Sequence, residues 1–144
     1  MIFVDKKQSL FSVDLSKYAL GHCISKDAVM GAGIARTFSL KYPDNTAFCR
    51  THKPDVGTAL CYQNNEVIIY NLSTKLRARD KPTYTSLGRS LVSLRGQMQS
   101  KGQLHLAIPR IGCGLDRLYW GNVQAILYAV FKDTDIEVLV CVHS

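Results

Sequence analysis

The sequence predicts an α/β domain whose mixed, six-stranded sheet is covered by helices on both faces. Six short runs rich in branched and aromatic apolar residues are typical of strands, and segments with helical spacing fill most of the gaps between them. Their order is strand, strand, helix, hairpin, helix, strand, helix, strand. Strands reached through helical crossovers are usually parallel, whereas a hairpin adds an antiparallel pair, so the sheet is expected to be mixed.

The predicted strands cover residues 2–4, 18–25, 58–62, 67–72, 104–109 and 136–142. The segment "QNNE", residues 63–66, separates the third from the fourth, and its Asn-Asn pair is typical of a hairpin turn. We therefore expect these two strands to pair antiparallel.

Three segments show helical patterns. In residues 82–101, apolar side chains recur at steps of four, three and four, at Leu87, Leu91, Leu94 and Met98. Pro82 suits a first helical position, and Lys101 followed by Gly102 is a typical end. Residues 119–133 carry an apolar stripe that includes Trp120 and Leu127. Residues 33–42 form a shorter helix closed by Pro43, and residues 43–57 are predicted as a long loop or a short irregular helix.

Length and composition predict one compact domain over residues 1–144, because 16.1 kDa and 47% apolar residues are usual for a single globular unit. No apolar run approaches the roughly 18 residues needed to span a bilayer. The five cysteines are widely spaced without a C-x-x-C pair, which favours reduced thiols over a metal site. These features predict a soluble intracellular protein of the cytoplasm or nucleus, without metal, cofactor or membrane contact, and nothing requires more than a monomer.

The charge balance favours acidic partners. Eighteen basic and eleven acidic residues leave a formal charge of +7 and a pI near 9.3. Such a field attracts phosphates, nucleic acids or acidic proteins. The sequence lacks the paired aromatic residues and basic stripe of a single-strand binding platform, so a nucleic-acid module is the weaker interpretation.

Two glycine-rich segments follow predicted strands and precede helices, where ligands of open α/β sheets bind. They are "HCISKDAVMGAGIA", residues 22–35, and "PRIGCGLDRL", residues 109–118. Glycines let main-chain N–H groups approach an anion closely. Neither segment is a Walker loop or a complete dinucleotide motif. Each alone could be an ordinary tight turn, but two in one basic domain strengthen the case for a phosphate site.

Asp116 and Lys75 are the candidate catalytic side chains. Asp116 could cap the following helix or act as a base beside a phosphate loop, with Arg110 and Arg117 favouring its ionised form. Lys75 is the first of four cations after the predicted strand 67–72, where a loop side chain can still point into a cleft, and an amine there can act as a nucleophile. For the three cations that follow it, Arg77, Arg79 and Lys81, a solvated loop is the better interpretation.

Together the segments "HCISKDAVMGAGIA", "NLSTKLRARDKPTY" and "PRIGCGLDRLYW" resemble the terminal ADP-ribose protein glycohydrolase branch of the macrodomains. The pattern T-Y-x-x-L-x-x-S-L at residues 83–91 and the tail "VFKDTDIEV" also fit, so the resemblance covers residues 9–142. It implies a three-layer α/β/α fold with a mixed six-stranded sheet. It further implies removal of ADP-ribose from acidic side chains of modified proteins and deacetylation of O-acetyl-ADP-ribose.

The resemblance also implies residue roles. Lys75 matches the nucleophile that attacks the anomeric carbon of the distal ribose, and Asp116 matches the acid/base residue. Ser25 and the loop Arg110, Ile111, Gly112, Cys113, Gly114 and Leu115 match positions that hold the substrate. Leu10 matches a residue on the adenosine side, while Gly31, Ala32 and Gly33 belong to the phosphate and distal-ribose loop. We expect the Cys113 thiol to pack and not to react.

Departures from the branch concern the adenine side. Ser9 stands where the branch commonly has an aspartate that recognises the adenine amino group, and His143 stands where a leucine lines the pocket. "HCIS" replaces the asparagine-rich loop of the commoner hydrolytic macrodomains, which argues against their water-only mechanism. An ADP-ribose reader without turnover, an ADP-ribose 1''-phosphate phosphatase, and weak binding of nucleic acid or poly(ADP-ribose) remain alternatives.

Overall fold

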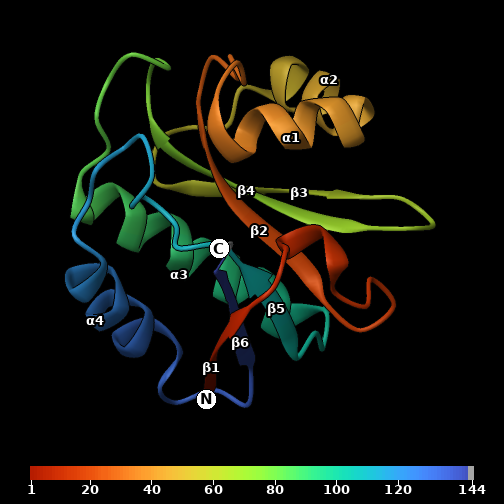
Figure 1. Cartoon of the computed structure of the whole chain (residues 1–144), viewed down its shortest axis with the longest axis vertical. Helices are drawn as coiled ribbons and strands as arrows, with labels where there is room; N and C mark the ends of the chain where they lie inside the picture. The colour runs from red at the N-terminus through yellow and green to blue at the C-terminus, as the bar shows by residue number, and fades with distance from the viewer. Residues whose placement is uncertain (143–144) are drawn as a thin grey trace.

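The computed structural model describes residues 1–142 (Figure 1). Its elements in chain order are β1 Ile2–Lys7, a 3₁₀ turn η1 Leu10–Ser12, β2 Ala19–Ser25, α1 Gly33–Lys41, α2 Pro43–His52, β3 Thr58–Gln63, β4 Ile68–Lys75, α3 Tyr84–Ser100, β5 His105–Ile108, α4 Trp120–Phe131 and β6 Glu137–Val142. All six predicted strands and the three predicted helices are present. His143, one of the two departures on the adenine side, lies outside the described residues.

The six strands form one sheet in the order β1-β6-β5-β2-β4-β3. β3 and β4 pair antiparallel, as the hairpin signal predicts, and every other neighbouring pair is parallel. The predicted mixed sheet is therefore confirmed. β2 lies in the middle, with β5 on one side and β4 on the other, so the chain segments that follow β2, β4 and β5 leave the sheet at the same edge.

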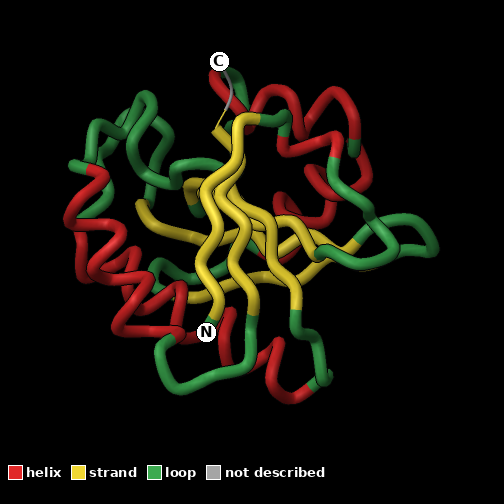
Figure 2. Tube along the Cα trace, turned by 60° about the horizontal axis from the view of Figure 1, so that its bottom comes forward, coloured by secondary structure: helices red, strands yellow, loops and turns green. Residues whose placement is uncertain are grey.

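Helices cover both faces of the sheet (Figures 1 and 2). α3 and α4 pack on one face, and α1 and α2 lie together on the other. Two apolar cores result, one including Leu91 of α3 and Leu127 of α4, the other including Phe38 of α1 and Cys49 of α2. The predicted three-layer architecture is confirmed.

Alternate residues of the inner strands enter opposite cores. In β6, Val138 and Val140 belong to the core beneath α3 and α4, whereas Leu139 and Cys141 belong to the core beneath α1 and α2. Because side chains alternate across a strand, burial on both faces requires an unbroken apolar run. This explains why the sequence shows continuous apolar strands without polar alternation.

Helix α3 begins two residues later than Pro82 suggests. Its N-cap is Thr83, whose hydroxyl accepts a hydrogen bond from Ser86 N at 2.9 Å, while Thr83 N donates to Ser86 Oγ at 3.1 Å. This reciprocal capping satisfies two main-chain groups at the helix start. Pro82 therefore lies just outside the helix and not at its first position.

Helix α2 lies within residues 43–57, where the sequence predicts a long loop or a short irregular helix. It is a regular ten-residue helix with Pro43 in its first turn, so the proline that ends α1 also begins α2. The sequence pattern missed it because its buried face is largely polar: Asn45, Thr46 and Cys49 point inward. A helix without an apolar stripe gives no periodic signal.

Asn45 belongs to a buried polar network that ties α2 to the sheet. Asn71 of β4 exchanges hydrogen bonds with Asn45, at 2.8 and 3.1 Å, and its Oδ1 accepts from His22 Nε2 at 2.7 Å. The His22 ring stacks on Phe38 with 3.8 Å between centroids. Burial lowers the pKa of His22 to about 4, although the bond to Asn71 acts in the opposite direction. Its Nδ1 has no partner within residues 1–142, so a proton there would find no acceptor.

The five cysteines carry no disulfide. No helix in residues 1–142 is long and apolar enough to cross a bilayer. In that same part of the chain, no three His, Cys, Asp or Glu side chains gather as a metal site would require.

Acidification should unfold the protein partly through His22. Below pH 6.5 the unfolded chain binds a proton at this imidazole, but the folded chain does not until about pH 4. The contribution of neutral His22 to the free energy of unfolding is therefore fully present above pH 6.5, and the free energy of unfolding falls by up to about 3 kcal/mol as the pH drops to 4. In H22Q the side-chain amide can still donate to Asn71 and cannot titrate. Urea unfolding of both proteins at several pH values should show a steeper loss for the wild type, and parallel losses would contradict this origin.

Candidate active site

A cleft lies at the carboxyl ends of β2, β4 and β5. It consists of two adjoining cavities of about 710 and 780 Å³ that share Ile34, Pro109, Arg110 and Gly114 in their walls. Ligands of α/β sheets usually bind at the carboxyl ends of the parallel strands, next to a central strand from which the strand order continues in both directions. The fold thus places the cleft where the sequence analysis expects a ligand.

All thirteen residues singled out from the sequence line this cleft. The first cavity is lined by Ser25, Gly31, Ala32, Gly33, Lys75, Arg110, Ile111, Gly112, Gly114, Leu115 and Asp116. The second is lined by Leu10 and Cys113, again with Arg110 and Gly114. Segments more than 100 residues apart in the chain thus meet around one continuous hollow.

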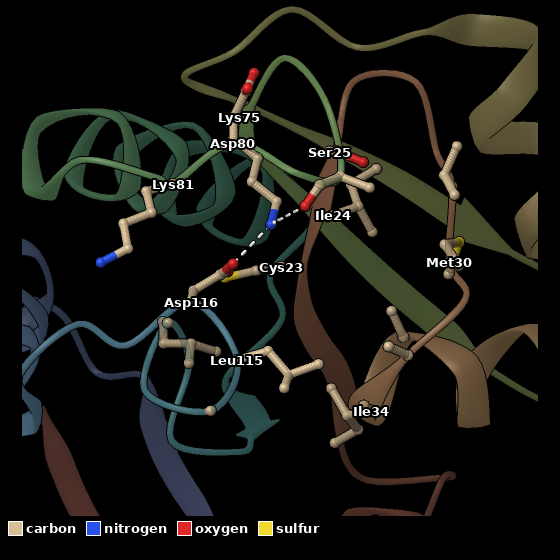
Figure 3. A pocket seen from close by; sticks show the side chains of 18 of the residues that line it. Cys23, Ile24, Ser25, Met30, Ile34, Lys75, Asp80, Lys81, Leu115 and Asp116 are labelled. Carbon is tan, nitrogen blue, oxygen red and sulfur yellow. Dashed lines mark hydrogen bonds and ion pairs between the residues drawn. The ribbon is translucent and has the colours of Figure 1, made fainter.

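The Lys75 amine and the Asp116 carboxylate point toward one another in the first cavity (Figure 3). Lys75 Nζ lies 2.7 Å from Asp116 Oδ1, and the two side chains are only 14% and 18% exposed. A charge-assisted contact of this length between partly buried groups is strong and lets a proton pass directly from one to the other. The pair is thus suited to proton transfer, nucleophilic attack or both.

Lys75 is the last residue of β4, and the first turns of α3 hold the end of that strand. Ser86 Oγ donates to Thr74 O at 2.7 Å, and Ser90 Oγ donates to Ser73 O at 2.9 Å. A second contact fixes the amine itself, because Lys75 Nζ donates to Ala78 O at 2.9 Å. Hydrogen bonds thus fix both the main chain just before Lys75 and the amine that points into the cavity.

Asp116 lies in the loop between β5 and α4, which is closed by a hydrogen bond from Leu118 N to Gly112 O at 2.7 Å. The Tyr84 hydroxyl of α3 accepts from Tyr119 N at 3.0 Å and from Asn122 Nδ2 at 3.2 Å. Tyr119 is the N-cap of α4, so Asp116 does not cap that helix. The helix-cap interpretation of Asp116 is therefore wrong, and its partner is Lys75.

The two arginines that flank Asp116 in the sequence do not pair with it in the described chain. Arg110 lies 3.9 Å from Asp5 Oδ2, and its guanidinium stacks over Trp120, 5.5 Å from the ring centroid. Arg117 is exposed in the left-handed region, with φ +58°. The positive charge beside Asp116 comes from Lys75.

The first glycine segment supplies free main-chain donors to the cavity. Within residues 1–142, the N–H groups of Gly31 and Ala32 have no protein acceptor. α1 begins at Gly33 without a side-chain cap, and its first turn lines the cavity. The partial positive charge of an uncapped helix start, together with exposed N–H groups, is suited to an anion such as a phosphate.

The glycines of the two loops serve two purposes. Gly33 and Gly112 have φ +60° and +73°, and a Cβ at Gly112 would lie 2.8 Å from Leu118 Cδ1. Backbone conformation requires glycine there. At Gly31 and Gly114 a Cβ would meet no atom within 4 Å. These two glycines are therefore not required by the protein's own packing, and their effect is to leave the space beside the main chain open to a ligand. Gly112 therefore meets a backbone requirement in addition to lining the cavity.

Asp27, for which the sequence predicts no role, also lies beside the cleft. Ser25 Oγ donates to Asp27 Oδ1 at 2.5 Å, and Val29 N donates to the same oxygen at 3.3 Å. An aspartate that accepts the N–H two residues ahead forms an Asx turn, and the sequence Ser-x-Asp directly after a strand is a signal for one.

The thiols next to the cleft are held neutral. Burial, with the nearby Asp116 charge, raises the pKa of Cys23 to about 12, and burial also raises the pKa of Cys113. Cys113 Sγ donates to Ile111 O at 3.4 Å. A neutral thiol is a poor nucleophile. These environments fit the expected packing role of Cys113.

The second cavity is lined on one side by the turn η1. Ser9 caps this turn by accepting a hydrogen bond from Phe11 N at 3.2 Å, while Leu10 is buried. Trp120 and Tyr119 line the opposite side. The cavity is therefore mostly apolar and aromatic, which suits a flat ring system.

Comparison with known proteins identifies relatives by sequence, although no protein-family model matches the chain. The chain is 43% identical to the human and bovine proteins named ADP-ribose glycohydrolase OARD1, over 122 residues that cover 85% of this chain and 80% of each relative. It is also 37% identical, over 93 residues, to the uncharacterized protein 032R of invertebrate iridescent virus 6.

Solved structures share the fold. The macrodomains of DarG from Thermus aquaticus and Mycobacterium tuberculosis superpose with a TM-score of 0.88 over 97% of both chains, at 21% identity. DarTG of Thermosipho africanus, solved in complex with ADP-ribose, superposes with a TM-score of 0.80 over 94% of this chain and 39% of that one. The fold, the cleft at the strand ends and the identity over most of the chain agree, and the chain belongs to the macrodomains, in the branch of the terminal ADP-ribose glycohydrolases.

Proposed function

We propose that this protein is a hydrolase that removes ADP-ribose from modified aspartate or glutamate side chains and deacetylates O-acetyl-ADP-ribose. The observation that carries the proposal is the 2.7 Å contact between Lys75 and Asp116 inside a cleft with anion-binding walls. The 43% identity to proteins named ADP-ribose glycohydrolase supports it.

The ligand extends along both cavities. Its diphosphate lies against the N–H groups of Gly31, Ala32 and the first turn of α1, where the helix dipole stabilises negative charge. The adenosine occupies the apolar second cavity beside Leu10. This placement brings the distal ribose to the first cavity, between the amine and the carboxylate.

The glycohydrolase reaction begins with a proton passing from Lys75 to Asp116 along their contact. The neutral amine attacks the anomeric carbon of the distal ribose, and the bond from that carbon to the acceptor carboxylate breaks. The carboxylate leaves with the bonding electrons and needs no added proton. Asp116 next gives up its proton to solvent and is ionised again. It then takes a proton from a water molecule, whose oxygen attacks the anomeric carbon while the bond from that carbon to Lys75 breaks, so ADP-ribose leaves and Lys75 returns to an amine.

Deacetylation needs only the carboxylate. Asp116 takes a proton from a water molecule, which attacks the acetyl carbonyl, and acetate leaves from the ribose oxygen as that oxygen is protonated. The amine takes no part in bond making or breaking in this reaction. A reader without turnover would need neither group in contact with the other, so their pairing favours catalysis over binding alone.

Removing either member of the pair should stop the glycohydrolase reaction. K75M keeps the length of the side chain but removes the nucleophile, so release of ADP-ribose from an auto-modified acceptor should become undetectable. D116N should lower both activities by about 10²–10⁴-fold, the usual contribution of a general acid/base. Initial rates of ADP-ribose and acetate release measure both effects.

The exposed pair formed by Lys26 and Asp55 offers a matched control. Its Nζ–Oδ1 distance is also 2.7 Å, but neither residue lines the cleft. K26M and D55N should keep both activities. Full glycohydrolase turnover in K75M would exclude the lysine mechanism.

Replacing Gly112 and replacing Gly114 by residues with a side chain should have different effects, one on stability and the other on ligand binding. G114V fills open space in the cleft, so it should weaken ADP-ribose binding without lowering stability. G112A forces alanine into a left-handed conformation and against Leu118, so it should lower the free energy of unfolding by about 1–2 kcal/mol or more. Calorimetric titration with ADP-ribose and urea unfolding separate the two effects. Equal affinity of G114V and the wild type would place the ligand elsewhere.

A further inference from the structure

Asp27 is a carboxylate beside the cleft, in addition to Asp80 and Asp116 of the cleft wall, and hydrogen bonds fix its position. Its Oδ1 accepts hydrogen bonds from Ser25 Oγ at 2.5 Å and from Val29 N at 3.3 Å. Its Oδ2 accepts from Ala78 N at 3.4 Å. Both oxygens are therefore used, and the Ala78 contact joins residues 51 positions apart.

The turn that carries Asp27 is braced from below. Ala28 is fully buried in the left-handed region, with φ 52°, and its N–H donates to Ser25 O at 2.9 Å. Arg50 of α2 donates from Nε to Ala28 O at 3.1 Å. A strained residue held on both sides by hydrogen bonds leaves the turn one conformation, so the Asp27 carboxylate is presented at a fixed place.

This turn is joined along its length to the segment that follows β4. Lys26 N donates to Lys75 O at 2.8 Å, and Asp27 N donates to Leu76 O at 3.3 Å. The Asp27 carboxylate extends the ladder by one step, to Ala78 N. The carbonyl of the same Ala78 is the acceptor that holds Lys75 Nζ at 2.9 Å.

We propose that Asp27 is a positioning residue for Lys75: by holding Ala78, it sets the carbonyl that aims the amine at the anomeric carbon. The proposal rests on the proposed function and deepens it. Once Lys75 has given its proton to Asp116, their ion pair is gone, and within residues 1–142 Ala78 O is the remaining hydrogen-bond acceptor of the amine. The bond to Ala78 then directs the lone pair into the cavity.

The charge of Asp27 suits this task. Loss of solvent around the carboxylate raises the pKa of Asp27, but the hydrogen bonds from Ser25, Val29 and Ala78 and the nearby charge of Lys75 outweigh that effect, so the pKa lies below its ordinary value. The group is therefore a carboxylate at neutral pH and only accepts hydrogen bonds. An asparagine side chain has the same shape, but only its oxygen accepts hydrogen bonds, because its nitrogen is a donor.

The sharpest test is D27N, because it changes one oxygen into a donor without changing the shape of the side chain. Its amide oxygen can keep the bonds to Ser25 and Val29, but its NH₂ group then faces Ala78 N, and the two donors repel. Glycohydrolase kcat should fall by about 10- to 100-fold, as misplacement of a reacting group does. Deacetylation, in which Lys75 is not the nucleophile, should keep its kcat.

The ratio of the two activities in one sample is the deciding measurement, since partial unfolding lowers both alike. The dissociation constant of ADP-ribose should stay unchanged in D27N, and D55N should behave as the wild type in every assay. Loss of both activities in D27N in equal proportion, or loss of ADP-ribose affinity to the same extent as kcat/KM, would overturn the proposal. If K75M is inactive, a D27N enzyme with wild-type glycohydrolase kcat would also overturn it. An active K75M would instead exclude the lysine mechanism of the proposed function, on which this proposal rests.

Discussion

The contact between Lys75 and Asp116 is the interaction on which the site depends. An amine and a carboxylate held together at 14% and 18% exposure would be costly to bury singly, but each compensates the other. They come from the end of β4 and from the loop after β5, 41 residues later. In the sheet, β4 and β5 lie on either side of β2 and run parallel to it, so the segments that follow them leave at the same edge, next to Ser25 at the end of β2.

Helix α3 holds both halves of that contact through its first turns. Ser86 and Ser90 bind carbonyls of β4 just before Lys75, while Tyr84 accepts from the first residues of α4, behind the Asp116 loop. The polar positions of the pattern T-Y-x-x-L-x-x-S-L therefore have structural reasons, and Leu87 and Leu91 of the same pattern fill the core. One helix links core packing to the geometry of the site.

The two cavities of the cleft differ in the polar and charged groups that line them. The start of α1 and its preceding glycines offer main-chain donors suited to a diphosphate, and the second cavity is mostly apolar. The wall of the first cavity also contains the carboxylates Asp80 and Asp116 and the cations Lys75, Arg79 and Lys81. The excess of +7 over the whole chain attracts an anionic ligand, and the chemistry that we propose lies where Asp116 meets Lys75.

The sequence by itself determined the strands, the hairpin, three of the four helices and the two glycine loops, because those features follow from local propensity and periodicity. It also indicated Lys75 and Asp116 as candidates, since each follows a strand end. Only the tertiary structure decided that these two side chains touch, that α2 is a helix with a polar buried face, and that His22 and Asn71 bond in the core. The contacts of Asp27, too, depend on the ladder between residues 25–28 and 75–78. The reason is physical: such contacts join segments tens of residues apart, and their partners are set by strand order and packing, which leave no mark on neighbouring residues.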